Sequence, residues 1–350
     1  MRVLAINSSL RGGGQSTTEL MISWLAGGMK EAGAEVRVIN LRKKKVRYCT
    51  GCYSCSTRTP GRCVIKDDMT EEIYPGFLKS DLAVLGTPLF YNTLNAPMKA
   101  FIERTWPVCI PYLEQEEDGT WTHPLRHPLP RVVMLAVAGF PDISVFKPLS
   151  DYARGLFGER LAAEIYRPGS ETLIRSSGKL KEEVKDAVHR AGIQLVTDGN
   201  VDDLTLETIA RPTGDVDTFR EMANCFWKTC INEKVTPRQF DKRGMVPRPD
   251  SISSFLAVMG KGISLPEDDS IEAVIGFSFS GEPAGDCHFA ISRGAVIARE
   301  GRSEATDLLI ETPFDAWADI MTGKADAKEL FMNGTCRATG DFALMNLFSG

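Results

Sequence analysis

The sequence predicts an α/β fold, a doubly wound parallel sheet, followed by a smaller α+β domain. Three observations carry this prediction. Between residues 2 and 166, apolar runs that end in small-residue loops alternate with helical patterns, which is typical of βαβ units. A stretch rich in proline and basic residues follows at 232–250, and beyond it short runs alternate apolar with polar residues, as antiparallel strands do. The 350 residues are enough for two domains with separate cores.

The first domain is predicted to span residues 1–205 and to contain a five-stranded parallel sheet. Its inner strands are apolar throughout, which fits a sheet covered on both faces. The strands are predicted at 2–7, 35–40, 81–86, 131–138 and 159–166. Apolar residues at helical spacing predict helices around 20–29, 98–102, 146–157 and 179–191.

Residues 206–248 are predicted to form a helical extension and linker, and residues 249–350 the second domain. The extension contains helical patterns at 204–209 and 217–231. In the second domain we expect strands that turn at Arg293-Gly294 and are flanked by short helices. The strands are predicted at 272–280, 287–292, 295–298 and 306–310, and the helices at 253–259, 314–322 and 327–332.

Charge and hydropathy exclude two classes of protein. The net charge is -5, whereas a nucleic-acid-binding surface is normally basic, so nucleic acid is excluded as the main partner. The one basic run, residues 42–47, is interpreted as a solvated loop. No run approaches the roughly 18 apolar residues of a membrane span, and the N-terminus lacks the features of a signal peptide. A cytoplasmic location is therefore expected, where clustered cysteines indicate metal or redox chemistry rather than disulfides.

The loop after the first strand is rich in glycine, serine and threonine, and it opens a helix. Backbone N–H groups and the positive helix end at such a turn attract a phosphate. The hydroxyls of Ser9, Ser16 and Thr17 can add hydrogen bonds, and Arg11 can add charge. The loop has neither the dinucleotide G-x-G-x-x-G pattern nor the G-K-[ST] of a P-loop. A plain capped turn is the alternative.

Two more loops follow buried strands and so lie at the carboxyl edge of the sheet, where open α/β sheets bind ligands. In one, two aromatic side chains can flank a flat ring while backbone N–H groups reach its polar edge. In the other, glycine allows a close approach and Phe140 can stack. Simple packing is the alternative for each loop alone, but all three loops would converge on one crevice. The ligand-binding candidates are Pro88, Leu89, Phe90, Tyr91, Asn92, Ala138, Gly139 and Phe140.

Four cysteines lie close together in the sequence, in the pattern Cys49-x2-Cys52-x2-Cys55-x7-Cys63. Four thiolates in one compact loop can hold an iron–sulfur cluster. They can also hold zinc, although two overlapping C-x2-C steps suit a cubane better than a zinc knuckle. Free or redox-active thiols are the third interpretation.

Residues 1 to about 205 resemble the NADPH-dependent FMN reductase family. The stretch from Ser9 through Gln15 to Thr17 is similar to its phosphate loop, and 87–92 with 96–104 to its flavin loop and following helix. Leu10 and Gln15 depart from the proline and asparagine that are frequent there. The resemblance implies a flavodoxin-like fold, bound FMN with Gln15 among its contacts, NAD(P)H as electron donor, and a homo-oligomer with flavin sites near subunit contacts.

The cysteine spacing resembles that of the iron–sulfur flavoproteins, a branch of the same family. That resemblance implies a [4Fe-4S] cluster near the flavin, with Cys49, Cys52, Cys55 and Cys63 as ligands. The wider family often keeps part of this motif without a cluster, so free thiols and zinc stay open.

A third resemblance covers about residues 250–348. The stretches 277–279, 307–312, 314–326, 331–334 and 340–344 are similar to a sterol-carrier-protein-2 (SCP2) domain. Such domains enclose an apolar tunnel, which implies a lipid or another hydrophobic ligand. A fold of this kind can equally serve for dimerisation or docking.

Taken together, these features predict an FMN-dependent oxidoreductase, or electron-transfer flavoprotein, in which the flavin does the chemistry and no side chain acts as a catalytic base. NAD(P)H, ferredoxin or a quinone-like molecule would be its redox partner. Two alternatives stay open: a non-catalytic electron carrier fed by ferredoxin, and a protein that binds lipid through the SCP2-like domain. The sequence names neither the physiological donor nor the acceptor.

Overall fold

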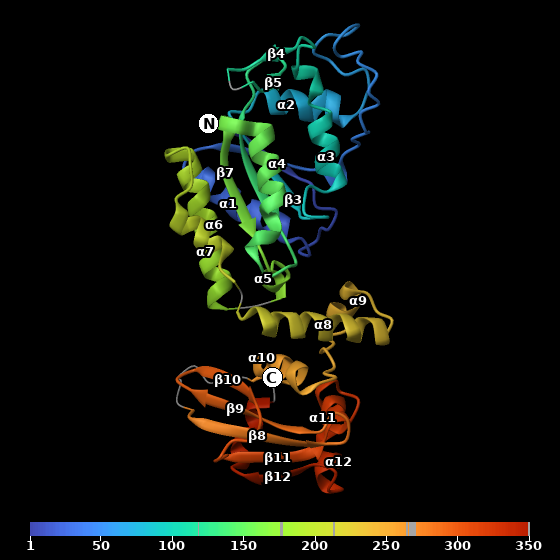
Figure 1. Cartoon of the computed structure of the whole chain (residues 1–350), viewed down its shortest axis with the longest axis vertical. Helices are drawn as coiled ribbons and strands as arrows, with labels where there is room; N and C mark the ends of the chain where they lie inside the picture. The colour runs from blue at the N-terminus through green and yellow to red at the C-terminus, as the bar shows by residue number, and fades with distance from the viewer. Residues whose placement is uncertain (118, 176–177, 213, 264, 266–270, 349–350) are drawn as a thin grey trace. The chain divides into compact units, whose positions relative to one another are not determined.

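The chain divides into two compact units, Met1–Thr213 and Gly214–Gly350, in a computed structural model (Figure 1). The structure describes every residue except 118, 176–177, 213, 264, 266–270 and 349–350. Each unit has its own sheet and its own core. The finer boundaries at 205 and 249 stay a prediction.

The first unit is built on a five-stranded sheet whose neighbouring strands all run parallel. The strand order β2-β1-β3-β6-β7 is that of a flavodoxin-like fold, so the predicted fold class is confirmed. The strands are β1 (Arg2–Asn7), β2 (Glu35–Asn40), β3 (Leu82–Pro88), β6 (Arg131–Val137) and β7 (Leu161–Arg167).

Helices cover both faces of this sheet, as its apolar strands require (Figure 1). One face packs against α1 (Thr17–Glu31), α5 (Glu171–Arg175), α6 (Lys179–Thr197) and α7 (Asp203–Ala210). The other packs against α2 (Tyr74–Leu78), α3 (Ala96–Glu103) and α4 (Lys147–Phe157). A two-stranded ribbon, β4 (Glu114–Gln115) with β5 (Trp121–Thr122), was not predicted; each of its strands has only two residues, too few to show a period.

The second unit is α+β, with a five-stranded mixed sheet in the order β10-β9-β8-β11-β12. Only β8 and β11 pair in parallel. Its strands are β8 (Ala273–Ser280), β9 (Gly285–Ser292), β10 (Ala295–Glu300), β11 (Leu308–Pro313) and β12 (Arg337–Gly340). The turn at Arg293-Gly294 joins β9 to β10 with both residues at positive φ, 50° and 71°, as a two-residue hairpin requires. The short edge strand β12 is absent from the sequence prediction.

The helices of the second unit are α8 (Val216–Asn232), α9 (Pro237–Lys242), α10 (Ile252–Gly262), α11 (Phe314–Met321) and α12 (Ala327–Met332). Shorter helical segments of the chain lie at Leu41–Lys43, Met69–Ile73, Trp106–Val108, Ile143–Phe146, Gly158–Arg160 and Phe342–Phe348. Among the described residues, no helix combines the length and the apolar character needed to cross a membrane.

Aromatic rings fill the core between α10 and the second sheet. Phe255 of α10 is 1% exposed and makes edge contacts, at centroid distances of 4.9 to 6.3 Å, with four phenylalanines. Those four are Phe277, Phe279, Phe289 and Phe314. Aromatic rings therefore pack closely around Phe255 in the described part of this core.

Candidate functional site

The first candidate loop joins β1 to α1 and presents backbone N–H groups at the start of a 15-residue helix. Ser16 is the N-cap, and its hydroxyl accepts a hydrogen bond from the Glu19 N–H at 3.1 Å. Gly13 and Gly14 adopt positive φ, 66° and 81°, and no atom lies within 4 Å of where a Cβ would sit. The loop therefore leaves open space over its glycines, as a phosphate site requires.

The predicted phosphate contacts differ in accessibility. Ser9, Ser16 and Thr17 are buried, whereas Arg11 and Gln15 are exposed. The Arg11 guanidinium forms an ion pair with Glu171 at 2.7 Å, so it is already engaged. An exposed pair of this kind is weak and can open to a ligand.

Arg42 belongs to the run interpreted as a solvated loop, yet its side chain is only 16% exposed. It forms an ion pair with Glu19 at 2.8 Å and lies so close to the first loop that a Cβ at Gly12 would come within 2.8 Å of its Nε. The signal available in the sequence was its position two residues after the strand that pairs with β1. The Arg42 side chain therefore packs against the first candidate loop at Gly12.

The second candidate loop is a tight turn at the end of β3. Phe90 and Thr93 exchange backbone hydrogen bonds of 3.1 and 3.0 Å, and the two residues between them, Tyr91 and Asn92, have φ of 47° and 62°. Two central residues at positive φ define a type I′ turn, which suits asparagine and strains tyrosine. Tyr91 is fully exposed at 100% and Phe90 is 56% exposed. Both aromatic side chains are therefore available to a ligand, while Pro88 and Leu89 are half-buried.

The third candidate loop follows β6. The Ala138 N–H donates to the Arg167 carbonyl at 3.0 Å, and the Gly169 N–H donates to the Phe140 carbonyl at 2.7 Å. The Phe140 side chain is 62% exposed, and nothing lies within 4 Å of where a Cβ of Gly139 would sit. Hydrogen bonds thus fix the backbone of this loop, while the Phe140 side chain stays exposed to solvent.

Hydrogen bonds connect the three loops at the carboxyl edge of the sheet, beside α5 in Figure 1. The Ser8 N–H donates to the Gly86 carbonyl at 2.9 Å, which joins the first loop to β3. The Leu89 N–H donates to the Val137 carbonyl at 2.8 Å, which joins the second loop to β6. The Thr17 hydroxyl donates to the Ser170 carbonyl at 3.2 Å, and the Ser170 N–H reaches the Ala138 carbonyl. The structure therefore brings together the three loops that the sequence singled out.

The cysteine loop lies elsewhere, at the opposite end of α3. At the first end of α3, the Asn95 side chain caps the helix and donates to the Ser8 carbonyl at 2.8 Å. At the far end, Arg104 contacts Asp67, just beyond the cysteines. An eight-residue helix is about 12 Å long at 1.5 Å per residue, so helix α3 separates the two candidate sites.

The four clustered cysteines are free thiols; Cys49 and Cys52 are exposed, and Cys55 and Cys63 are half-buried. Hydrogen bonds from Ser54 lower the pKa of Cys52 to about 7. Burial, followed by the charges of Cys63 and Cys49, raises the pKa of Cys55, so these thiols lie within electrostatic range of one another. As placed, no three His, Cys, Asp or Glu side chains of the described residues are grouped to hold a metal ion. The donors thus fit a cluster in kind and number, but in their present positions the side chains are not grouped around one point.

The sequence analysis missed the ion pair beneath this loop. Arg104 and Asp67 are 1% and 0% exposed at their side chains and lie 2.8 Å apart. Hydrogen bonds from Arg104, Arg47 and Thr70 outweigh burial and lower the pKa of Asp67. The nearest signal was the sequence position of Asp67, four residues after the last cysteine.

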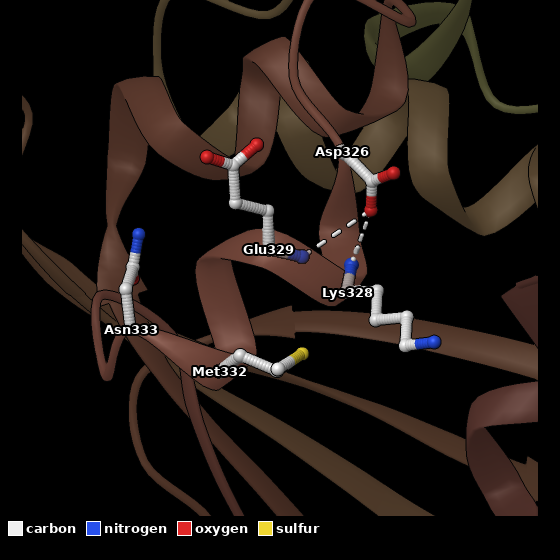
Figure 2. A pocket seen from close by; sticks show the side chains of 5 residues that line it. All are labelled: Asp326, Lys328, Glu329, Met332 and Asn333. Atoms are coloured by element: carbon white, nitrogen blue, oxygen red, sulfur yellow. Dashed lines mark hydrogen bonds between the residues drawn. The ribbon is translucent and has the colours of Figure 1, made fainter.

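A shallow pocket of about 390 Å³ lies on the second unit, lined by residues of α12 and its ends (Figure 2). The Asp326 carboxylate accepts hydrogen bonds from the backbone N–H groups of Lys328 and Glu329, at 2.7 and 3.3 Å. Asp326 therefore serves as the helix cap. The remaining lining residues are Met332 and Asn333, and this pocket offers no chemistry.

Comparison with known families gives these features a context. Residues 1–116 match the model of the NADPH-dependent FMN reductase family. The matched segment contains the first two candidate loops and all four clustered cysteines, and it ends before the third loop. Residues 265–350 match the model of the SCP-2 sterol transfer family. Both resemblances stated from the sequence are confirmed.

Two curated relatives are archaeal iron-sulfur flavoproteins. The one from Methanocaldococcus jannaschii is 33% identical over 104 residues, which are 30% of this chain and 50% of the relative. The one from Archaeoglobus fulgidus is 38% identical over 79 residues, which are 23% of this chain and 34% of the relative. The chain spans at most 59% of the length of the curated relatives reported.

Solved structures that resemble the chain include an azoreductase from Bacillus anthracis and an NAD(P)H:quinone oxidoreductase from Methanothermobacter marburgensis. The first is 15% identical and covers 56% of this chain and 99% of its own, with a TM-score of 0.41. The second is 16% identical and covers 56% of this chain and 96% of its own, with a TM-score of 0.42.

Proposed function

We propose that the chain is an FMN-dependent oxidoreductase that accepts electrons from NAD(P)H. One observation carries the proposal: three loops converge at the carboxyl edge of a flavodoxin-like sheet, within a unit whose first part matches the FMN reductase family. Bound FMN would supply hydride and single-electron chemistry, for which no side-chain base is needed.

The first loop has the donors for the FMN phosphate. Its backbone N–H groups and the hydroxyls of Ser9, Ser16 and Thr17 stand at the positive end of α1, and the Thr17 hydroxyl would have to leave the Ser170 carbonyl to donate to a phosphate. The open space over Gly13 and Gly14 leaves room for the phosphate oxygens. Arg11 and Gln15 are exposed beside them and would complete the contact.

The second and third loops have the features needed to hold a flat ring. Phe90, Tyr91 and Phe140 are exposed and come from neighbouring strands, so they can cover the faces of an isoalloxazine. Backbone groups of Pro88, Leu89, Asn92, Ala138 and Gly139 would approach its polar edge. This assignment uses every residue of the two loops that the sequence indicated.

The FMN site is tested by titrating the flavin-free full-length chain with FMN, and then adding NADPH or NADH without oxygen. We expect one FMN per chain and loss of the flavin colour with either nucleotide. Phe140→Ala should weaken FMN binding roughly tenfold through lost ring contact. The matched control is Trp121→Ala, which removes an equally exposed aromatic from the β4–β5 ribbon. A wild-type chain that binds no FMN contradicts the proposal.

We further propose that Cys49, Cys52, Cys55 and Cys63 hold a [4Fe-4S] cluster. The spacing of four free thiols in one loop and the names of the archaeal relatives support this assignment. The test is an iron and acid-labile sulfide assay on anaerobically purified chain, where about four irons per chain are expected. Cys55→Ser should lower the iron content, and Cys109→Ser, a half-buried thiol outside the motif, should not. One zinc per chain, or no metal, would contradict the assignment.

The alternative function is that of an electron carrier that turns over no substrate. Such a carrier would bind the same cofactors but would receive its electrons from ferredoxin instead of NAD(P)H. Fast reduction by reduced ferredoxin together with a negligible NAD(P)H rate would favour that alternative. Lipid binding through the second unit is the less favoured alternative, because aromatic rings pack against one another around Phe255 in the described part of its core.

A further inference from the structure

One buried side chain holds both ends of the cysteine loop. Arg104, which directly follows α3, donates from Nη1 to the Arg47 carbonyl at 2.6 Å and to Asp67 Oδ2 at 2.8 Å. From Nη2 it donates to Asp67 Oδ1 at 2.9 Å and to the Thr70 hydroxyl at 2.9 Å. Arg47 precedes the first clustered cysteine by two residues, and Asp67 follows the last by four. A single guanidinium therefore closes the loop at its base.

Asp67 completes the same network from the other side. Its carboxylate accepts from the Arg47 N–H at 2.9 Å and from the Thr70 N–H at 3.2 Å, besides the two bonds from Arg104. Within the described part of the chain, Nε is the one guanidinium nitrogen of Arg104 without a partner. A buried ion pair is stable only when its remaining hydrogen-bonding positions are filled in this way, and removal of one partner then costs heavily.

Two further hydrogen bonds join the chain just outside the base of the loop. The Asp68 N–H donates to the Lys45 carbonyl at 3.1 Å, and the Lys45 N–H donates to the Asp68 carboxylate at 2.7 Å. Both groups are solvent-accessible, so they are weaker restraints than the buried pair beside them. Ordering a loop of this length has an entropic cost, and a buried bidentate contact at its base offsets it.

The guanidinium also lies against a cysteine. Burial lowers the pKa of Arg104, but the Asp67 carboxylate and the Cys63 thiol raise it, and the net shift is upward. Arg104 thus stays charged, with Cys63 among the groups that face it.

We propose that Arg104 is a positioning residue for the cysteine loop: it fastens both ends of the loop to α3, and this keeps the four thiols within one short closed segment from which they can gather around metal. The inference rests on the proposed cluster. It assigns a role to a residue outside both sets of proposed ligands, whose hydrogen-bond partners include Arg47, Asp67 and Thr70. Lysine is a poor substitute, because it cannot make the bidentate contact with Asp67 while reaching Arg47.

The test compares Arg104→Gln and Arg104→Lys with Lys99→Gln in the full-length chain. Lys99 is a matched control, since it lies on α3 and loses an exposed ion pair with Glu103. Three quantities are measured: the affinity for FMN, the iron bound after anaerobic reconstitution with iron and sulfide, and the rate of tryptic cleavage after Arg58 and Arg62 in the metal-free chain. Both cleavage sites are exposed residues of the cysteine loop.

In Arg104→Gln we expect the loop to open more often, so that cleavage at Arg58 and Arg62 is roughly tenfold faster. Bound iron should fall to less than about half the wild-type value, because the two ends of the loop that carries the thiols are no longer held together. FMN affinity should stay within about twofold, since the flavin loops lie at the other end of α3. Arg104→Lys should restore part of both losses, and Lys99→Gln should match the wild type.

Unchanged cleavage and unchanged iron in both Arg104 variants would overturn the inference. A parallel loss of FMN binding and of iron in Arg104→Gln would indicate a general folding defect of that variant. In that case Arg104→Lys decides. If it binds FMN normally and resists trypsin like the wild type, the inference is wrong. If the wild-type chain binds FMN but no iron, the proposed cluster fails, while the cleavage rates still decide whether Arg104 fastens the loop.

Discussion

Gly28 of α1 and Gly192 of α6 bring their two helices into backbone contact. A Cβ at Gly28 would lie 1.8 Å from the His189 carbonyl oxygen, and a Cβ at Gly192 would lie 2.2 Å from the Leu25 carbonyl oxygen. Neither neighbour is a side chain that can rotate away. The close packing of α1, the helix that starts at the first candidate loop, therefore depends on the absence of two side chains.

The first prediction follows from this contact. Gly28→Ala and Gly192→Ala should each lower the free energy of unfolding by about 1–3 kcal/mol or more, because the helices must separate to admit a methyl group. Gly155→Ala is the matched control, since Gly155 lies in α4 with nothing within 4 Å of its Cβ position. Urea unfolding should show that variant equal to the wild type or up to about 1 kcal/mol more stable. Equal stability of all three variants would contradict the packing described.

The N-cap of α1 gives the second prediction. Ser16→Ala removes the acceptor for the Glu19 N–H and should lower the free energy of unfolding by about 1 kcal/mol. It should also weaken FMN binding roughly tenfold, because a hydroxyl beside the phosphate is lost. Ser23→Ala, at an exposed position of the same helix, should change neither quantity. A stability loss without any change in FMN affinity would leave Ser16 as a cap alone.

Substitution of Tyr91 should affect FMN binding without lowering the stability of the flavin-free chain. Asparagine tolerates the positive φ of a type I′ turn better than tyrosine, so Tyr91→Asn should leave the flavin-free chain as stable as the wild type or up to about 1 kcal/mol more stable. The same change should weaken FMN binding roughly tenfold, because the ring is lost. Flavin fluorescence titration and urea unfolding measure the two effects. Undiminished FMN affinity would remove Tyr91 from the site.

The buried carboxylate of Asp67 should make the free energy of unfolding depend on pH. Its pKa lies below the ordinary value of 3.8, so its stabilising contribution is complete above about pH 4 and is lost as the pH falls toward the folded-state pKa. In Asp67→Asn the free energy of unfolding should fall less steeply below pH 4. At pH 7 that variant should be about 3–5 kcal/mol less stable, because Arg104 keeps a buried charge without its partner.

The control for Asp67 is Asp151→Asn. Asp151 forms an exposed ion pair with Lys147, so its loss should change stability by less than about 1 kcal/mol. Unfolding of both variants is followed by tryptophan fluorescence between pH 2 and pH 7. The same pH profile in Asp67→Asn and the wild type would contradict the assigned role of Asp67.

Phe255 tests whether the second unit has a filled core. Phe255→Ala should lower the stability of that unit by about 3–5 kcal/mol, because four phenylalanine contacts are lost and a cavity remains. Phe342→Ala, which removes a side chain that is 62% exposed, should change it by less than about 0.5 kcal/mol. Saturable binding of a fluorescent fatty acid by the wild-type chain would show a cavity that the described core does not contain.

The candidate flavin site could be predicted from sequence because its parts follow local rules. Each of its three loops comes directly after an apolar strand, and the strand order places the ends of β1, β3 and β6 side by side. Glycine, serine and aromatic residues mark the loops in the sequence itself. What could not be predicted is the state of single side chains, such as the Arg11–Glu171 ion pair across 160 residues of chain.

For the cysteine loop, the sequence predicts the spacing of the thiols but not their place in the fold. The spacing of the four thiols is visible in the sequence, but their place at the far end of α3 from the flavin edge is not. Nothing in the sequence marks Arg104 as the residue that closes the loop, because its partners Arg47 and Asp67 lie 57 and 37 residues away. Arg167 is a similar case: it is fully buried and donates to the carbonyls of Ile209 and Arg211 at the end of α7.

The sequence by itself determined the fold class of both units, the three loops at the carboxyl edge and the spacing of the four clustered cysteines. These depend on periodicity, on turn residues and on short spacings, which are properties of neighbouring residues. Only the tertiary structure decided which face each helix covers, which charges are buried in pairs, and that the cysteine loop lies at the other end of α3 from the three candidate loops. Those properties arise from contacts between residues distant in the chain, where the free energy of burial depends on partners that no local pattern identifies.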